Sequence, residues 1–166
     1  MKMTPELAKA AEKMKPGVIS RDGFFGHDER DLPTIINDQH ASCFRLGIHY
    51  RDIAAAMRRV GKAGMAGLGG PVTVEKKWEV VADENRGKIP CPWPEPGVYQ
   101  KTVYTVKNLA TATTAQYSEL TIHLVEKHDF FRGVGAPFHN SPEHLVAVLE
   151  ISPSDELPEV LNLSRA

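Results

Sequence analysis

The sequence predicts an α+β fold, in which a mainly antiparallel sheet is covered on one face by about three helices. Apolar and polar residues alternate along two segments between residues 71 and 106, as they do in half-buried strands. The link between these segments is too short for a crossover helix, so the pair is expected to be antiparallel. Elsewhere, helical periodicity and capping residues predict helices at 5–14, 41–60 and 118–128. Helices and strands separated along the chain in this way are typical of the α+β class.

The 166 residues are expected to form a single domain. Hydrophobic residues make up 42% of the chain and charged residues 25%, which matches ordinary globular domains and excludes a disordered chain. We place the domain at residues 1–151 and expect an acidic, loosely held tail at 152–166. No run approaches the roughly 20 apolar residues that a membrane-spanning helix needs. The first residues lack the apolar stretch of a secretion signal, so we expect a cytoplasmic protein whose two cysteines are reduced.

The helices are predicted from caps and apolar stripes. Thr4-Pro5-Glu6 supplies an N-cap, a first-turn proline and an acidic residue at the start of the 5–14 helix. The 41–60 helix is expected to end at Gly61. The next segment, 61–70, has five glycines in ten positions and is expected to be a mobile loop. The apolar stripe of the 41–60 helix consists of Leu46, Tyr50, Ile53, Met57 and Val60.

The sheet is expected between residues 71 and 116. Residues 117–128 fit either a strand or a helix, and their Leu, Glu and Lys content favours a helix. Residues 143–151 either join the sheet or form a short helix that begins after the N-cap Ser141. The expected segments of the sheet are, in order, a strand at 72–80, a turn at 83–87, a strand at 98–106 and an edge strand at 111–114.

Cysteine and histidine residues carry the leading functional hypothesis, a polar pocket that binds a small ligand or a metal, in a protein that could also be an enzyme. Cys91 lies in the segment 90–97, whose four prolines prevent it from joining a central strand. His123 and His128 resemble the histidine half of a zinc-finger helix, but the upstream cysteine pair of such a finger is missing. A tetrahedral zinc site would therefore be a composite one. The candidate ligands are Cys91, His123 and His128, completed by one of Asp129, His139 or His144.

The spacing of the two histidines constrains this site. Residues five apart lie about 140° apart around a regular helix, so both imidazoles reach one metal only if the last turn is distorted. In a strand the two side chains would face opposite ways. We expect the Cys91 thiol to be reachable by solvent. A competing hypothesis makes this thiol a catalytic nucleophile, with its pKa lowered by Arg86 and Lys88 and a histidine as the base.

Two further classes of function stay open. A protein-interaction module, or a homo-oligomer, would use Trp93 of the proline-rich loop and the aromatic pairs Phe24-Phe25 and Phe130-Phe131. An anion or nucleic-acid binder would use cationic residues beside the glycine-rich segment, although a net charge of −1 and the lack of a known nucleic-acid motif argue against nucleic acid. The leading hypothesis remains a protein that binds a metal or a small molecule, and no motif specifies a reaction. The cationic candidates are Arg58, Arg59 and Lys62.

Overall fold

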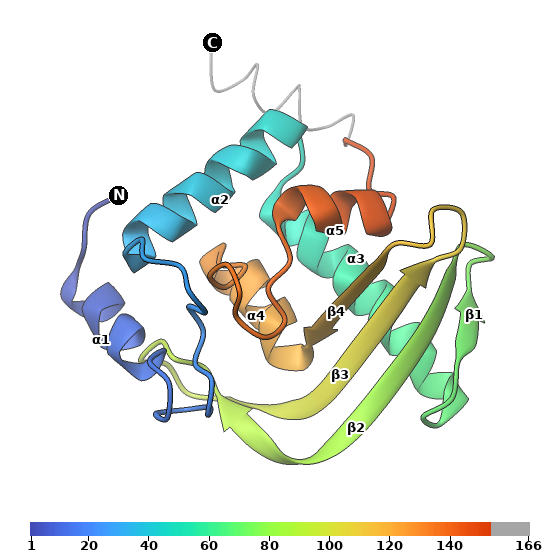
Figure 1. Ribbon diagram of the computed structural model, residues 1–166, viewed down its shortest axis with the longest axis horizontal. Helices are drawn as coiled ribbons and strands as arrows, with labels where there is room; N and C mark the ends of the chain where they lie inside the picture. The colour runs from blue at the N-terminus through green and yellow to red at the C-terminus, as the bar shows by residue number, and fades with distance from the viewer. Residues whose placement is uncertain (154–166) are drawn as a thin grey trace.

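Four antiparallel strands form a sheet with helices against one face, which confirms the predicted α+β class (Figure 1). The computed structural model describes residues 1–153, so most of the tail expected at 152–166 lies outside the described residues. Within residues 1–153, no helix combines the length and the apolar character needed to cross a membrane. The elements are α1 (Pro5–Lys13), α2 (Leu32–Leu46), α3 (Tyr50–Ala63), the 3-10 helix η1 (Gly64–Gly67), β1 (Val72–Val74), β2 (Trp78–Pro90), β3 (Val98–Asn108), β4 (Thr114–Ser118), α4 (Glu119–His128) and α5 (Pro142–Val148).

The sheet has the strand order β1-β2-β3-β4, and each strand is antiparallel to its neighbour. Val80 pairs with Val106, and Tyr104 pairs with Tyr117. All four side chains are fully buried, so they mark the inner face of the sheet. Helices α3, α4 and α5 pack against the sheet, while α2 packs on α5 and α1 packs on α2 (Figure 1). Three helices thus cover one face, which is the predicted number, but α1 was expected among them and packs on α2 instead, while α5 contacts the sheet in its place.

The strand expected at 72–80 is in fact a hairpin. The chain reverses at residues 75–77, where Glu75 and Lys76 have positive φ angles, and Val74 pairs with Trp78 across the turn. The alternation in the sequence conceals this turn because three residues separate the paired positions, so both still face the core. The turn expected at 83–87 is also wrong. Strand β2 continues to Pro90 through a bulge between Asn85 and Lys88, and residues 83–88 are polar because all of them are exposed.

The helix expected at 41–60 is two helices. Helix α2 begins at Leu32 after the N-cap Asp31, whose carboxylate accepts a hydrogen bond from the Thr34 N–H. It ends at Gly47, which is left-handed with φ +69°, and α3 begins three residues later. The interruption takes three residues, and the apolar stripe continues on the next helix with nearly helical spacing. Periodicity alone therefore joined the two helices into one.

The glycine-rich segment is structured rather than mobile in its first half. Gly61 lies inside α3, where a Cβ would lie 2.9 Å from the Tyr104 ring, so α3 does not end there. Gly64 begins η1 and packs against the Val80 side chain, where a Cβ would clash. These glycines allow the helix to approach the sheet closely, which is a packing role. This packing role does not support the expectation of a mobile loop over residues 61–67.

Two clusters of buried apolar residues form the core. The larger cluster lies between the sheet and helices α3, α4 and α5, and includes Trp78, Tyr104 and Met57. The second cluster joins α1, α2 and α4 to the loop 91–97 and the loop that follows α1. Cys43 belongs to the first cluster and Cys91 to the second.

Candidate metal centre

The proline-rich loop 91–97 folds back onto the end of α4. Cys91 is 3% exposed and Trp93 is 5% exposed, so the expectation of a solvent-reachable thiol is wrong. The Trp93 ring stacks on the His128 ring with centroids 3.9 Å apart and planes within 5°, and it meets Phe130 edge-on. These aromatic contacts bury the loop although its prolines keep it out of the sheet. The thiol is therefore brought to the histidines from the interior side of the loop.

Four side chains from the loop and α4 converge on one point. The Glu95 Oε1 atom lies 2.6 Å from His123 Nε2 and 3.0 Å from His128 Nε2. The Cys91 Sγ atom lies 3.7 Å from the same His128 Nε2. One sulfur, two imidazole nitrogens and one carboxylate oxygen all lie within 4.8 Å of one another. This is a donor set of the kind that holds a transition metal in proteins.

The two imidazoles meet without the distortion expected of the helix. Helix α4 stays helical through His128 and ends at Asp129, which is left-handed with φ +53°. The ring centroids of His123 and His128 lie 5.4 Å apart with planes at 80°. Side-chain reach, not a change in the backbone, therefore bridges the rotation of about 140° between the two positions. Glu95 lies where the two Nε2 atoms converge, and it contacts both.

Tyr99 on β3 supports His123 from behind. Its ring stacks on the imidazole at 4.3 Å, and its hydroxyl lies 3.0 Å from Nδ1 and 3.2 Å from Nε2 of His123. The stacked phenol ring restricts the orientation of the His123 imidazole. The His123 and His128 side chains are 11% and 12% exposed, whereas Glu95 is 30% exposed. The site is therefore closed on the core side and reached from the side of Glu95.

Burial and hydrogen bonding set the protonation of the site. Burial, with a contribution from the neighbouring Glu95, raises the pKa of the Cys91 thiol to about 12. Burial alone would raise the pKa of Glu95, but hydrogen bonds from Cys91, His128 and His123 lower it to about 2. Burial lowers the pKa of His128, which favours the neutral imidazole that metals bind. The protonated thiol does not fit the activated nucleophile hypothesis, since Arg86 and Lys88 are exposed on β2 and do not offset burial.

The donor distances are compatible with a tetrahedral ion. Zinc bonds of about 2.0–2.3 Å place neighbouring ligand atoms about 3.4 Å apart, because the ligands occupy the corners of a tetrahedron. The separation of 3.7 Å between Cys91 Sγ and His128 Nε2 is close to this spacing. The two shorter contacts of Glu95 are hydrogen-bond distances, and they would have to open by roughly half an ångström around an ion.

The fourth member of this donor cluster is Glu95, which the sequence analysis did not identify. Of the six candidate ligands, the structure brings Cys91, His123 and His128 together and holds the other three elsewhere. Glu95 lies four residues after Cys91 in the same short loop, and this proximity was the only signal that could have identified it. The contacts of the other three are Asp129 Oδ2 to His40 Nδ1 at 2.6 Å, His139 Nδ1 to Phe131 O at 3.0 Å, and His144 Nε2 to Thr114 O at 2.6 Å.

The residues behind the alternative hypotheses have partners within the chain. Arg58 donates two hydrogen bonds to the Glu126 carboxylate, and Arg59 is paired with Glu75 at 3.0 Å, while Lys62 is exposed. Two of the three cationic candidates are therefore already neutralised by carboxylates. Phe25 is half-buried, and the other aromatic residues that would contact a partner protein are buried and anchor loops on the core. These residues are Phe24, Trp93, Phe130 and Phe131.

Comparison with protein families, curated proteins and solved structures found no match for this sequence or fold. What the site can bind is therefore inferred from its donor atoms, their burial and their supporting contacts.

Proposed function

We propose that this protein is a zinc-binding protein in which one ion links the loop 91–97 to the end of α4. The ligands are Cys91 Sγ, Glu95 Oε1 and the Nε2 atoms of His123 and His128. The observation that carries the proposal is the mutual approach of these four atoms within 4.8 Å, from two elements more than twenty residues apart. Convergence of one thiol, two imidazoles and one carboxylate is the pattern of a composite zinc site.

The donor chemistry selects the class of metal. A thiol and two imidazoles are soft or borderline ligands, which bind zinc and other late transition metals and bind Ca²⁺ or Mg²⁺ poorly. With four protein ligands the tetrahedral set of zinc is complete, and such closed sites stabilise a fold. The ion would fasten a loop whose backbone forms no strand pairing with the sheet. We therefore infer a structural role for the metal.

The state of the cysteines supports a reducing compartment. Both cysteines are free, and they lie in different core clusters, so no disulfide joins them. A reduced thiol is also the form that a zinc site needs, because the thiolate is the ligand. We infer a cytoplasmic location on this ground, since disulfides are rare there. Free thiols and zinc binding at the same site would make the protein sensitive to oxidation at Cys91.

Zinc titration of the full chain tests the proposal. Protein stripped with a chelator is titrated with Zn²⁺ in competition with a chromophoric chelator, and one equivalent is expected to bind. The His128→Ala variant is expected to lose at least about 100-fold in affinity, because it removes a direct ligand rather than a supporting contact. His27→Ala is the matched control, since His27 is exposed and lies outside the four ligands. Equal binding by both variants, or no binding by the wild type, would contradict the proposal.

A further inference from the structure

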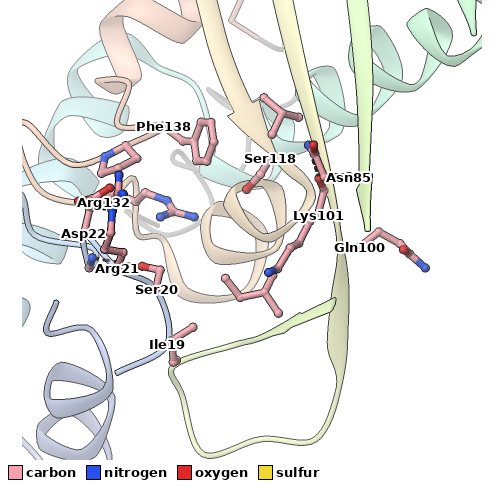
Figure 2. A pocket seen from close by; sticks show the side chains of 14 residues that line it. Ile19, Ser20, Arg21, Asp22, Asn85, Gln100, Lys101, Ser118, Arg132 and Phe138 are labelled. Carbon is pink, nitrogen blue, oxygen red and sulfur yellow. Dashed lines mark hydrogen bonds and ion pairs between the residues drawn. The ribbon is translucent and has the colours of Figure 1, made fainter. Parts of the chain in front are cut away.

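A second site lies apart from the metal ligands. A pocket of about 510 Å³ opens between the loop after α1, the outer parts of β2 and β3, and the loop 132–138 (Figure 2). None of the four proposed zinc ligands lines it. Ile89 and Gln100 line the pocket, while the intervening loop carries Cys91 and Glu95. One hairpin therefore contributes to two different sites.

Arg132 lines this pocket with a buried and unpartnered charge. The residue is 4% exposed, and its Nε atom is buried without a hydrogen-bond partner. Its guanidinium lies 4.5 Å from the Phe24 ring centroid and 5.6 Å from that of Phe138. No carboxylate in residues 1–153 forms an ion pair with it, and burial alone lowers its pKa to about 9, which leaves it charged at neutral pH. A buried cation without a counter-charge is unfavourable in a folded protein, and a ligand that brings an anion relieves it.

Hydrogen bonds at Arg132 and its two neighbours along the chain fix the position of its backbone. Its carbonyl accepts a hydrogen bond of 2.8 Å from the Gln39 amide, and Gln39 in turn accepts from the Phe131 N–H. The Gly133 N–H donates to the Phe24 carbonyl at 2.9 Å. Arg132 itself has a φ of +68°, a conformation that non-glycine residues rarely adopt. The strained residue is therefore fixed by its neighbours, as strained residues at binding sites commonly are.

The remaining lining is suited to an organic anion. In Figure 2 the Arg132 guanidinium and the Lys101 amine point into the same space, and Ser118, whose hydroxyl caps α4, lies beside it. Three of the lining side chains are cationic and one is acidic. The acidic one, Asp22, lies 3.6 Å from the guanidinium of Arg21 at the rim. Apolar walls accompany these charged groups, and they are formed by Ile19, Ile89, Val103, Pro137 and Phe138.

We propose that this pocket binds a small organic anion, a carboxylate or phosphate ester attached to an apolar body. The forked guanidinium of Arg132 presents parallel N–H donors that match two oxygens of such a group. Lys101 contributes a second charge, and the Phe138 ring covers the apolar body. The inference goes beyond zinc binding, since it uses different residues and needs no metal.

Binding of simple probes to the full chain tests this proposal. Benzoate and phenyl phosphate carry the expected group on an apolar ring, benzamide is the uncharged counterpart of benzoate, and inorganic phosphate lacks the apolar body. Ligand-observed NMR at millimolar concentrations is expected to detect benzoate or phenyl phosphate in the pocket and no binding of benzamide. Binding of inorganic phosphate as strongly as phenyl phosphate would show that the apolar walls do not take part, and would overturn the organic-anion assignment.

Three variants connect the binding to the pocket. Arg132→Met is expected to weaken anion binding by roughly 10- to 100-fold, because a charge-assisted pair is lost. Lys101→Gln, nearer to solvent, is expected to weaken it by about 2- to 5-fold. Lys107→Gln on the same strand is the control, because Lys107 does not line the pocket, and it should bind like the wild type. Circular dichroism verifies that each variant is folded. Failure of both anions to bind, or unchanged binding in Arg132→Met and Lys101→Gln, would refute the proposal.

Discussion

The two polar sites beside the second core cluster present groups of opposite character to a ligand. At the loop 91–97, electron-pair donors face one another, and Glu95 accepts hydrogen bonds from two imidazoles. At Arg132 a single cation faces two aromatic rings and an open pocket. A cluster of donors is completed by a cation, whereas a lone buried cation is completed by an anion. The comparison shows that the ligand class of each site can be inferred from the charge that the protein itself leaves unbalanced.

Removal of the Trp93 ring that stacks on His128 is expected to have the largest effect on stability and on zinc affinity. Trp93→Ala deletes a side chain that is 5% exposed and stacks on His128, so the protein should lose about 3–5 kcal/mol of unfolding free energy. Zinc affinity should also fall by roughly 10- to 100-fold, since the orientation of His128 depends on this contact. Urea unfolding and zinc titration measure the two effects. Trp93→Phe keeps an aromatic ring and should recover most of the stability and of the zinc affinity. A Trp93→Ala variant as stable as the wild type would contradict this packing.

Zinc itself is expected to stabilise the fold by a comparable amount. At free Zn²⁺ about 1,000 times above the dissociation constant, the ion adds about 4 kcal/mol to the free energy of unfolding. The melting temperature should therefore rise on adding zinc to the stripped protein and fall back with a chelator. In Glu95→Ala the rise should shrink, and in His123→Ala it should disappear. The same rise in all three proteins would place the zinc-binding site elsewhere.

At the other site, removal of a charge is expected to stabilise the apo protein. Arg132→Met replaces an unpaired buried cation by an apolar chain of similar length, and such replacements leave stability unchanged or raise it by about 1–3 kcal/mol. Arg132→Lys keeps the charge and should gain nothing. Urea unfolding in a buffer whose only anion is chloride compares the two variants with the wild type. A clear loss of stability in Arg132→Met would mean that the two aromatic rings already balance the charge.

A smaller effect on the free energy of unfolding is expected at low pH, through the Glu95 carboxylate of the donor cluster. Hydrogen bonds hold the folded pKa of Glu95 at about 2, below its ordinary value of 4.5. A group with a lowered folded pKa stabilises the protein above its unfolded pKa, and that stabilisation is lost as pH falls. For Glu95 the loss is expected between about pH 4.5 and pH 2. In the metal-free protein, Glu95→Gln should be less stable than the wild type at pH 7. Between about pH 4.5 and pH 2 its free energy of unfolding should fall by less than that of the wild type. Parallel pH curves for the two proteins would refute the hydrogen-bonded arrangement of the cluster.

Most elements of the fold could be predicted from local sequence signals. Thr4 and Ser141 mark true helix starts, and residues 119–128 form a helix as their composition favoured. Two of the errors share one physical cause, which is that hydrophobic periodicity continues through a short interruption. The turn at 75–77 leaves Val74 and Trp78 on one face, and the break at Gly47 leaves the apolar stripe intact. Only the backbone reveals that the chain changes direction at these points.

The site was less predictable than the fold. The zinc hypothesis identified three of the four side chains that now lie together, because cysteine and histidine have few competing roles outside the core. Glu95 was missed because acidic residues are common on surfaces, and only its contacts with the imidazoles distinguish it. Arg132 could not be found at all, since its significance lies in burial without a partner. Sequence reports which residues are present, whereas burial and pairing depend on contacts between distant segments.

Cobalt substitution tests the metal centre most directly, because it reports the thiolate ligand itself. Co²⁺ added to the stripped protein is expected to give an intense near-ultraviolet charge-transfer band together with the visible bands of a tetrahedral site. The chain offers a matched pair of buried thiols, Cys91 at 3% and Cys43 at 2% exposure. The charge-transfer band should vanish in Cys91→Ala and persist in Cys43→Ala. A charge-transfer band that survives in Cys91→Ala, or a wild-type protein without one, would contradict a metal centre at the loop 91–97.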